Sequence, residues 1–209
     1  MSTLAHQPSA EDQLTFLSKL QRLFSEGDFT ATYKFALLIA LADLAVERGN
    51  DTDAPLTLAL RDIAARFIGL YWNHVAPFGE HNDAQAAGML SQNLGAQAAV
   101  LSAIADFRRQ TNVSTIRQAN QDASYPALLS KVVGVVSAQP VNYLQNFGGV
   151  TDQFLYERSG QGRLTLKPGV AFCLRRFYPL VQQLARSHWV GHIKSNQRNQ
   201  QLLAMLVLG

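Results

Sequence analysis

The histidines are the side chains in this 209-residue chain that most readily bind metal ions or transfer protons. His188 and His192 are four residues apart, so on a helix they would share a face and be placed to bind one metal ion. The residues between them do not form the HExxH pattern of metalloproteases, and no carboxylate follows Glu157. Because a metal site needs further ligands, we expect both histidines to pack against neighbours or face solvent.

The other reactive side chains lack the partners that catalysis requires. His74 and His81 flank a turn containing proline and glycine, without an accompanying nucleophile or acid. Cys173 is the only cysteine and lies among apolar residues, where a thiol is usually a small buried side chain. The chain contains neither a P-loop nor a GxSxG motif. The sequence therefore predicts no catalytic residue and no cofactor.

Three acidic residues lie in or near apolar helical segments, namely Asp43, Glu47 and Asp62. Burial would shift the pKa values of these carboxylates and mark a functional site. Pairing at the surface is the alternative, and we favour it because arginines are close in sequence. These are Arg48, Arg61 and Arg66.

Charge is strongly segregated along the chain. The 52 residues after Glu157 contain eight basic and no acidic residues, whereas the first 157 contain ten basic residues and all 15 acidic ones. The net charge of +3 therefore combines −5 in the first part with +8 in the second. A segment of one sign beside an acidic body is typical of polyanion binding or of docking to an acidic partner.

The basic segment supplies candidate ligands for phosphate. We select Arg175, Arg176, Arg186, Lys194 and Arg198. On a helix, Arg175 and Arg186 would return to nearly the same angle because they are eleven residues apart. Hydrogen-bonding and stacking groups lie among them: Tyr178, Trp189, Asn196, Gln197 and Asn199. The alternative is a solvated helix face whose charge is balanced in space by the acidic N-terminal helices.

Helical periodicity dominates the elements that would position these residues. We expect a mainly α fold, in which a flexible tail of residues 1–9 precedes one bundle-like domain of residues 10–209. Ser9 and Asp12 have the types and spacing of a helix N-cap. The run FALLIALADLAV, residues 35–46, is apolar nearly all round but too short to span a bilayer, so it predicts a central helix and no membrane segment.

Three further predictions concern element boundaries. Residues 56–75 have helical spacing from Leu56 onward and predict one helix. A glycine-bearing turn between short segments of strand composition predicts a β-hairpin near residues 152–167. A basic helical segment follows over about residues 170–198, with a kink or break at Pro179.

The N-terminus and the cysteine content indicate a cellular compartment. The first twelve residues lack the basic and apolar stretches of a secretory signal. A single cysteine excludes an intrachain disulfide and agrees with a reducing environment. The sequence therefore predicts a cytoplasmic protein.

Several stretches together resemble the N-terminal region of bacterial HNH-endonuclease-type proteins. They are residues 16–24, 32–38, 42–44, 62–72 and 176–190, and TYKFALL is the most distinctive part. The resemblance implies a helical region followed by a nuclease module, whose HNH motif uses histidine to activate water and further His or Asn residues to hold a divalent metal. None of the five histidines here lies in a ββα-metal context, so the resemblance supplies no catalytic residue.

We therefore expect a non-catalytic helical module, resembling the N-terminal part of an HNH-type nuclease, that positions a nuclease or its complex on DNA through the basic segment. The alternative is a protein–protein interaction or oligomerisation module. There the apolar finish LLAMLVLG, residues 202–209, would contact a nuclease partner or a second copy of the chain. A third hypothesis is an enzyme that acts on a small molecule in a helical pocket. It stays open because pockets are not visible in a sequence.

Overall fold

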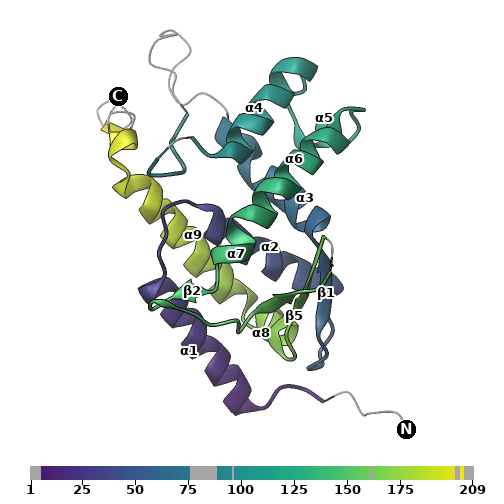
Figure 1. Cartoon of the computed structure of the whole chain (residues 1–209), viewed down its shortest axis with the longest axis vertical. Coiled ribbons are helices and arrows are strands. Elements are labelled where there is room, and N and C mark those ends of the chain that lie inside the picture. The colour runs from purple at the N-terminus through teal and green to yellow at the C-terminus, as the bar shows by residue number, and fades with distance from the viewer. Residues whose placement is uncertain (1–5, 76–88, 96, 161, 201–202, 205–209) are drawn as a thin grey trace.

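The computed structural model describes residues 6–75, 89–95, 97–160, 162–200 and 203–204. The expected mainly α fold with a small hairpin is confirmed in these residues (Figure 1). The helices are α1 (Ala10–Glu26), α2 (Tyr33–Arg48), α3 (Leu60–Tyr71), α4 (Ala99–Thr111), α5 (Ile116–Ala119), α6 (Tyr125–Ala138), α7 (Pro140–Tyr143), α8 (Val170–Arg176) and α9 (Tyr178–Ser195), with 3-10 turns η1 (Trp72–Val75) and η2 (Gln197–Asn199). The strands are β1 (Leu56–Ala59), β2 (Asn146–Phe147), β3 (Val150–Thr151), β4 (Tyr156–Arg158) and β5 (Arg163–Leu166).

α2 is the central element of the core. It contacts α3, α8 and α9, and every residue from Phe35 to Ala42 is buried, so this stretch has no side that faces solvent. Burying each of its large apolar side chains contributes about 1.5–3 kcal/mol. Among the described residues, no helix is both long and apolar enough to cross a membrane. The apolar run is therefore a core helix, as its length predicts.

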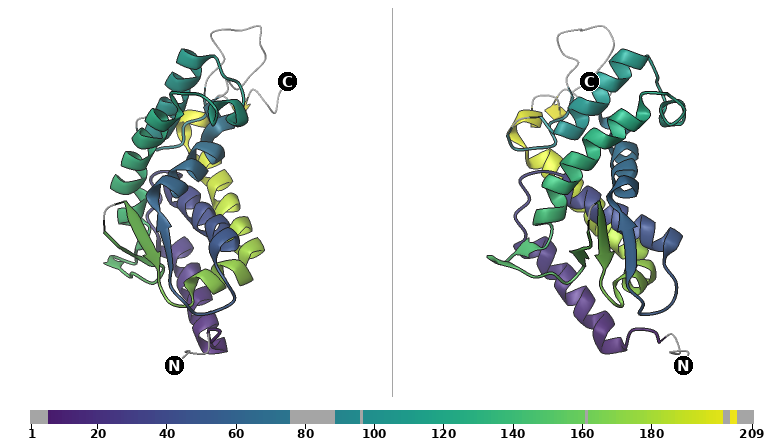
Figure 2. Two further views of the ribbon diagram at one scale, coloured as in Figure 1. Left: turned by 90° about the vertical axis from the view of Figure 1, so that its right-hand side faces the viewer. Right: turned by 45° about the vertical axis from the view of Figure 1, so that its right-hand side comes forward.

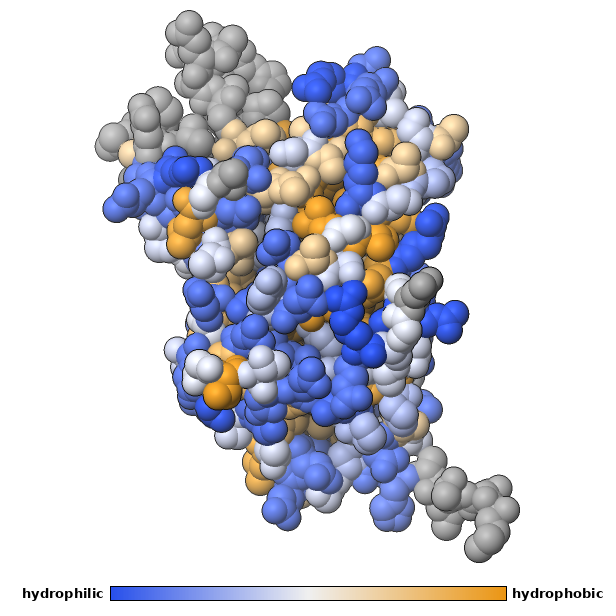
Figure 3. All heavy atoms as spheres, in the orientation of Figure 1, coloured by the Kyte–Doolittle hydropathy of each residue, from blue (hydrophilic) through white to orange (hydrophobic). Residues whose placement is uncertain are grey.

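A second group of helices packs on the far side of α3. α6 lies along α3, and α4 contacts both helices (Figure 2). On the face shown in Figure 3, apolar residues gather over α4 and α6, whereas the lower part is largely hydrophilic. The α3 helix therefore joins the central helices to this smaller group.

The N-cap predicted from Ser9 and Asp12 is confirmed as a capping box. The Ser9 hydroxyl oxygen accepts a hydrogen bond from the Asp12 amide at 3.1 Å, and the Asp12 carboxylate accepts one from the Ser9 amide at 3.0 Å. The Asp53 amide donates to the His6 carbonyl at 2.7 Å, and Pro8 is buried. These contacts hold residues 6–9 against the domain, although the sequence suggested a loose tail up to residue 9.

The predicted hairpin is the β4–β5 pair, and it belongs to a three-stranded antiparallel sheet ordered β1-β5-β4. Its turn contains Gly160 and Gly162, with φ angles of 68° and 72° that favour glycine. Leu58, Leu164 and Tyr156 point from the three strands into the core. The sheet thereby covers one side of the helices.

The first strand of this sheet corrects the prediction of one helix from Leu56. Residues Leu56–Ala59 form β1, and the helix begins at Leu60. Leu56 pairs with Leu166 and Leu58 with Leu164, while the hydroxyls of Thr57 and Thr165 lie 2.9 Å apart on the other face. The alternation of leucine and threonine fits a strand, but the partner strand lies more than a hundred residues away.

The predicted break at Pro179 is confirmed. α8 ends at Arg176, Phe177 leaves the helical conformation with φ −104° and ψ 22°, and α9 begins with Pro179 in its first turn. Proline is well suited to that position because the first-turn amides have no partner within the helix. The basic segment therefore consists of two helices.

A pair of leucine substitutions tests the central burial of α2. Leu38 is 0% exposed, whereas Leu14 on α1 is 67% exposed. Leu38→Ala should lower the free energy of unfolding by about 2–5 kcal/mol, because it removes buried methyl groups and leaves a cavity. Leu14→Ala should change it by less than about 0.5 kcal/mol. Urea unfolding followed by circular dichroism measures both values, and equal effects would contradict the central position of α2.

Candidate nucleic-acid interface

α9 presents one side to the core and the opposite side to solvent. Val181, Ala185, Trp189 and Ile193 recur every four residues and are buried against the central helix α2 and its neighbours. Neither α8 nor α9 contains an acidic residue. The outward side of these two helices is therefore the part of the basic segment that can meet an anionic partner.

Apart from Arg175, the basic residues of α8 and α9 are Arg176, Arg186 and Lys194. All three are exposed, and none forms an ion pair within the described part of the chain. The Arg186 Nε donates to Gln182 Oε1 at 3.1 Å, which orients the guanidinium and leaves its terminal N–H groups at the surface. Arg186 and Lys194 are eight residues apart, or about 12 Å along the helix. We call these three residues the α8–α9 cation row.

Arg175 points the other way and completes the C-terminus of α2. Its Nη1 donates to the carbonyls of Val46 at 3.0 Å and Gly49 at 2.9 Å, and its Nη2 pairs with Asp51 at 3.1 Å. The last carbonyls of a helix have no partner within it, so a guanidinium is well placed to satisfy them. The structure thus gives Arg175 a structural role, and the α8–α9 cation row does not include it.

Arg198 also bonds within the chain, in a group of side chains that holds residues 89–95. Its Nη1 donates to the Gly95 carbonyl. Asn196 Nδ2 donates to the Asn93 carbonyl at 2.9 Å, and Asn199 exchanges bonds of 2.7 and 3.0 Å with the Ser91 backbone. Both asparagines are buried, although the sequence suggested them as nucleic-acid contacts.

Gln92 is the centre of a buried polar network beneath the same segment. Its Oε1 accepts hydrogen bonds from Trp189 Nε1 at 2.9 Å and from Thr32 Oγ1 at 3.1 Å, and its Nε2 lies 3.2 Å from His74 Nδ1. The Thr32 hydroxyl lies 2.6 Å from that of Tyr71. Trp189 is thereby buried in the core and unable to stack on a base.

The remaining aromatic candidate, Tyr178, also has an internal partner. Its hydroxyl donates to Asp43 Oδ1 at 2.7 Å, and Gln182 Nε2 donates to the same oxygen at 2.9 Å. This bond to Asp43 raises the pKa of Tyr178. Asp43 therefore anchors the N-terminal turns of α9. Of the five hydrogen-bonding and stacking candidates, only Gln197 is exposed.

The two other carboxylates from the apolar segments form surface ion pairs. Glu47 pairs with Arg66, and Asp62 pairs with Arg48 at 2.5 Å. The favoured reading of these acids as surface residues is confirmed for both. Pairs of this kind at a surface contribute at most about 1 kcal/mol.

His188 and His192 have aromatic partners. His188 stacks on Phe24, with ring centres 4.7 Å apart, and the ring of His192 meets Phe35 edge-on at 6.3 Å. Burial lowers the pKa of His192 and also that of His74. No group of three His, Cys, Asp or Glu side chains suited to a metal occurs in the described ranges.

Cys173 and His81 complete the set of sequence candidates. Cys173 is buried, as expected, and burial raises the pKa of its thiol to about 11. The thiol is therefore protonated near neutral pH and behaves as an apolar side chain. His81 lies outside the described residues, as does most of the apolar finish at residues 202–209.

Comparison with known protein families gives a match over most of the chain. A family model with the description "Domain of unknown function (DUF8808)" matches residues 13–207. Neither the curated proteins nor the solved structures provide a significant match to the chain.

Alanine substitutions of the adjacent Arg175 and Arg176 test whether the first is structural and the second only exposed. Arg175→Ala should lower the free energy of unfolding by about 1–3 kcal/mol, because it leaves carbonyls at the end of α2 without their charged donor. Arg176→Ala should change it by less than about 0.5 kcal/mol. Urea titrations of the two variants check this difference, which should disappear if Arg175 is a surface side chain like Arg176.

The half-buried histidines His74 and His192 predict a pH dependence of stability. Because burial lowers the pKa values of His74 and His192, the unfolded chain binds more protons than the folded chain below about pH 6.5. The free energy of unfolding should therefore fall as pH decreases from about 7.5 to 5.5. His192→Phe removes one of these groups, so its loss of stability between the two pH values should be smaller. Urea midpoints at both pH values measure the effect, and an undiminished loss in the variant would exclude His192 as a contributor.

Proposed function

This chain belongs to the DUF8808 family, whose description assigns no activity, and from its own residues we propose that it is a non-catalytic module that binds nucleic acid. The α8–α9 cation row carries the proposal. Exposed arginine and lysine side chains that have no carboxylate partner can replace the counterions of a phosphate backbone. Arg186 is held by Gln182, so part of the row is pre-oriented.

The contact proposed here positions nucleic acid but does not read its sequence. Cations supply charge to phosphates, whereas sequence is read by groups that reach base edges. Trp189, Asn196 and Asn199 are buried and have internal partners, so they do not contribute such groups. We therefore propose binding that varies little with base sequence and falls steeply with salt.

The resemblance to the N-terminal regions of HNH-type proteins supports a role beside a nuclease. We propose that a nuclease module, on this polypeptide or on a partner, supplies the metal and the catalytic histidine. The domain itself would then hold DNA or RNA near that module. This part of the proposal depends on the resemblance and not on the geometry of the cation row.

A second candidate function is a protein–protein interaction module. A hollow of about 480 Å³ lies between α1 and α9, and its walls are mainly apolar. It is lined by Leu17, Leu20, Gln21, Phe24, Ser25, Leu180, Leu184 and His188. Exposed apolar surface of this kind suits contact with another protein. Light scattering would show a dimer or larger species under this second reading, and a monomer if nucleic acid is the partner.

Binding of a labelled 20-base-pair DNA at about 50 and 200 mM salt tests the first function. Fluorescence anisotropy should show binding that weakens as salt increases. Combined Arg176→Gln, Arg186→Gln and Lys194→Gln substitutions should reduce the slope of log affinity against log salt by about 2–3, because each lost phosphate contact contributes about 0.9.

A matched control removes three exposed cations from other helices. Arg61→Gln, Arg117→Gln and Lys131→Gln together lower the net charge equally but leave the α8–α9 cation row intact. This variant should bind with the wild-type slope. Absence of binding at low salt, or equal losses in the two triple variants, would reject the cation row as the interface.

A further inference from the structure

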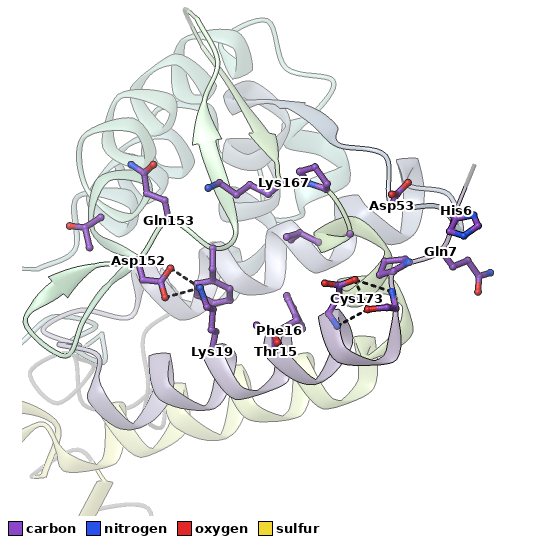
Figure 4. Close-up of a pocket in the computed structure, with 18 of the residues that line it drawn as sticks. His6, Gln7, Thr15, Phe16, Lys19, Asp53, Asp152, Gln153, Lys167 and Cys173 are labelled. Atoms are coloured by element: carbon purple, nitrogen blue, oxygen red, sulfur yellow. Dashed lines mark hydrogen bonds and ion pairs between the residues drawn. The ribbon is translucent and has the colours of Figure 1, made fainter. Parts of the chain in front are cut away.

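A cavity lies on the opposite side of α1 from the α1–α9 hollow, where four segments meet. Its volume is about 890 Å³, which is within the range of small-molecule sites. The walls are residues 6–9 with the following turns of α1, Asp53, residues 150–154, and residues 167–170 with Cys173 (Figure 4). Sequence periodicity gave no sign of it, because these segments are far apart along the chain.

One end of the cavity carries two ammonium groups. Lys19 Nζ lies 3.0 Å from Asp152 Oδ2, and Lys167 Nζ lies 3.0 Å from Glu157 Oε1. In Figure 4, Lys19, Asp152, Lys167 and Gln153 lie together at this end. Each ammonium has three N–H donors, so each can bind a further anionic oxygen while its carboxylate partner holds it in place.

The other end carries carboxylates. Asp53 is exposed and forms no ion pair within the described part of the chain. Its backbone is fixed because its amide donates to the His6 carbonyl at 2.7 Å and its carbonyl accepts from the Gly169 amide at 2.8 Å. Figure 4 places Asp53 with His6 and Gln7, away from Lys19. A cationic group entering the cavity would meet an unpaired negative charge here.

α1 places three of the lining residues in order along the cavity. Asp12, Phe16 and Lys19 all line the cavity and are spaced by four and three residues, so they follow one another along a single face of the helix. Asp12 and Lys19 are seven residues apart, which is about 10 Å along the axis. The order along this face is thus carboxylate, aromatic ring, ammonium.

The middle of the cavity is apolar. Phe16, Val170 and Cys173 are each less than 10% exposed and form part of its wall. Because burial raises the pKa of the Cys173 thiol to about 11, this side chain is neutral near pH 7. An apolar group of a ligand would therefore contact the wall between the two charged ends.

We propose that the cavity binds a short peptide with free termini, its amino group at Asp53 and its carboxylate between Lys19 and Lys167. An extended chain advances about 3.3–3.6 Å per residue, so two or three residues match the roughly 10 Å that separate Asp12 from Lys19 along α1. Asp12 adds negative charge at the amino end, although its Oδ2 already accepts hydrogen bonds from Ser9. A purely anionic ligand such as a nucleotide would face the unpaired Asp53. The proposal uses none of the residues of the α8–α9 cation row and is independent of it.

Isothermal titration with the tripeptide Ala-Leu-Ala tests the proposal. The peptide with free termini should bind saturably at one site. Acetylation of its amino group, or amidation of its carboxylate, should each raise Kd at least tenfold, because each removes one of the two charges. Equal binding of the blocked peptides, or no saturation at millimolar concentrations, would overturn the proposal.

Single substitutions assign each end of the peptide. Asp53→Asn should weaken the free peptide at least tenfold but leave the acetylated peptide unaffected. Lys19→Gln should weaken binding of the free peptide at least tenfold but leave binding of the amidated peptide unaffected. Lys167→Gln provides a second variant if loss of the Lys19–Asp152 pair disturbs folding. Glu11→Gln is the charge-matched control, since Glu11 is exposed on α1 outside the cavity, and it should bind as the wild type does. Unchanged binding in Asp53→Asn would overturn the assignment of the amino end.

Discussion

The apolar character of α2 on every side is the constraint on which the rest of the structure depends. A helix of this kind must be covered all round, because exposing any side of it would leave several leucines in water. α8 and α9 near the end of the sequence, and α3 from its middle, provide that cover. Of these covering helices, α9 has a single buried side, so its other side and the loops between the helices are where surface features with a potential function lie.

Local sequence patterns predicted the elements whose causes are local. The capping box at Ser9, the position of α2 and the helix break at Pro179 depend on residues within one or two turns, and all three are present. β1 was missed for the opposite reason. Residues Leu56–Ala59 have apolar positions that fit a helix as well as a strand, and only their distant partner β5 decides between the two. Tertiary contacts therefore outweigh local periodicity at this point.

The candidate site residues also depend on distant contacts, so their positions were harder still to predict from local sequence. Arg175 and Arg176 are adjacent and chemically identical. A rotation of about 100° around the helix nevertheless directs Arg175 to the end of α2 and Arg176 to solvent. The charge segregation seen in the sequence is likewise reduced in space, since Asp51 neutralises Arg175 and Glu157 neutralises Lys167. The large cavity beside α1 was not predicted at all, because its walls come from four separate segments.

The bond between Arg175 and the end of α2 also has a consequence for how the chain reaches this structure. Arg175 and Gly49 are 126 residues apart in the sequence, and β1 and β5 are separated by a similar length of chain. Contacts of this length close large loops, and their entropic cost must be met before they stabilise anything. Helical proteins with mostly local contacts fold fastest, whereas this one can complete its central helix and its sheet only after the C-terminal part of the domain has docked. Its folding rate should therefore be that of a mixed α/β protein of similar size, despite its helical content.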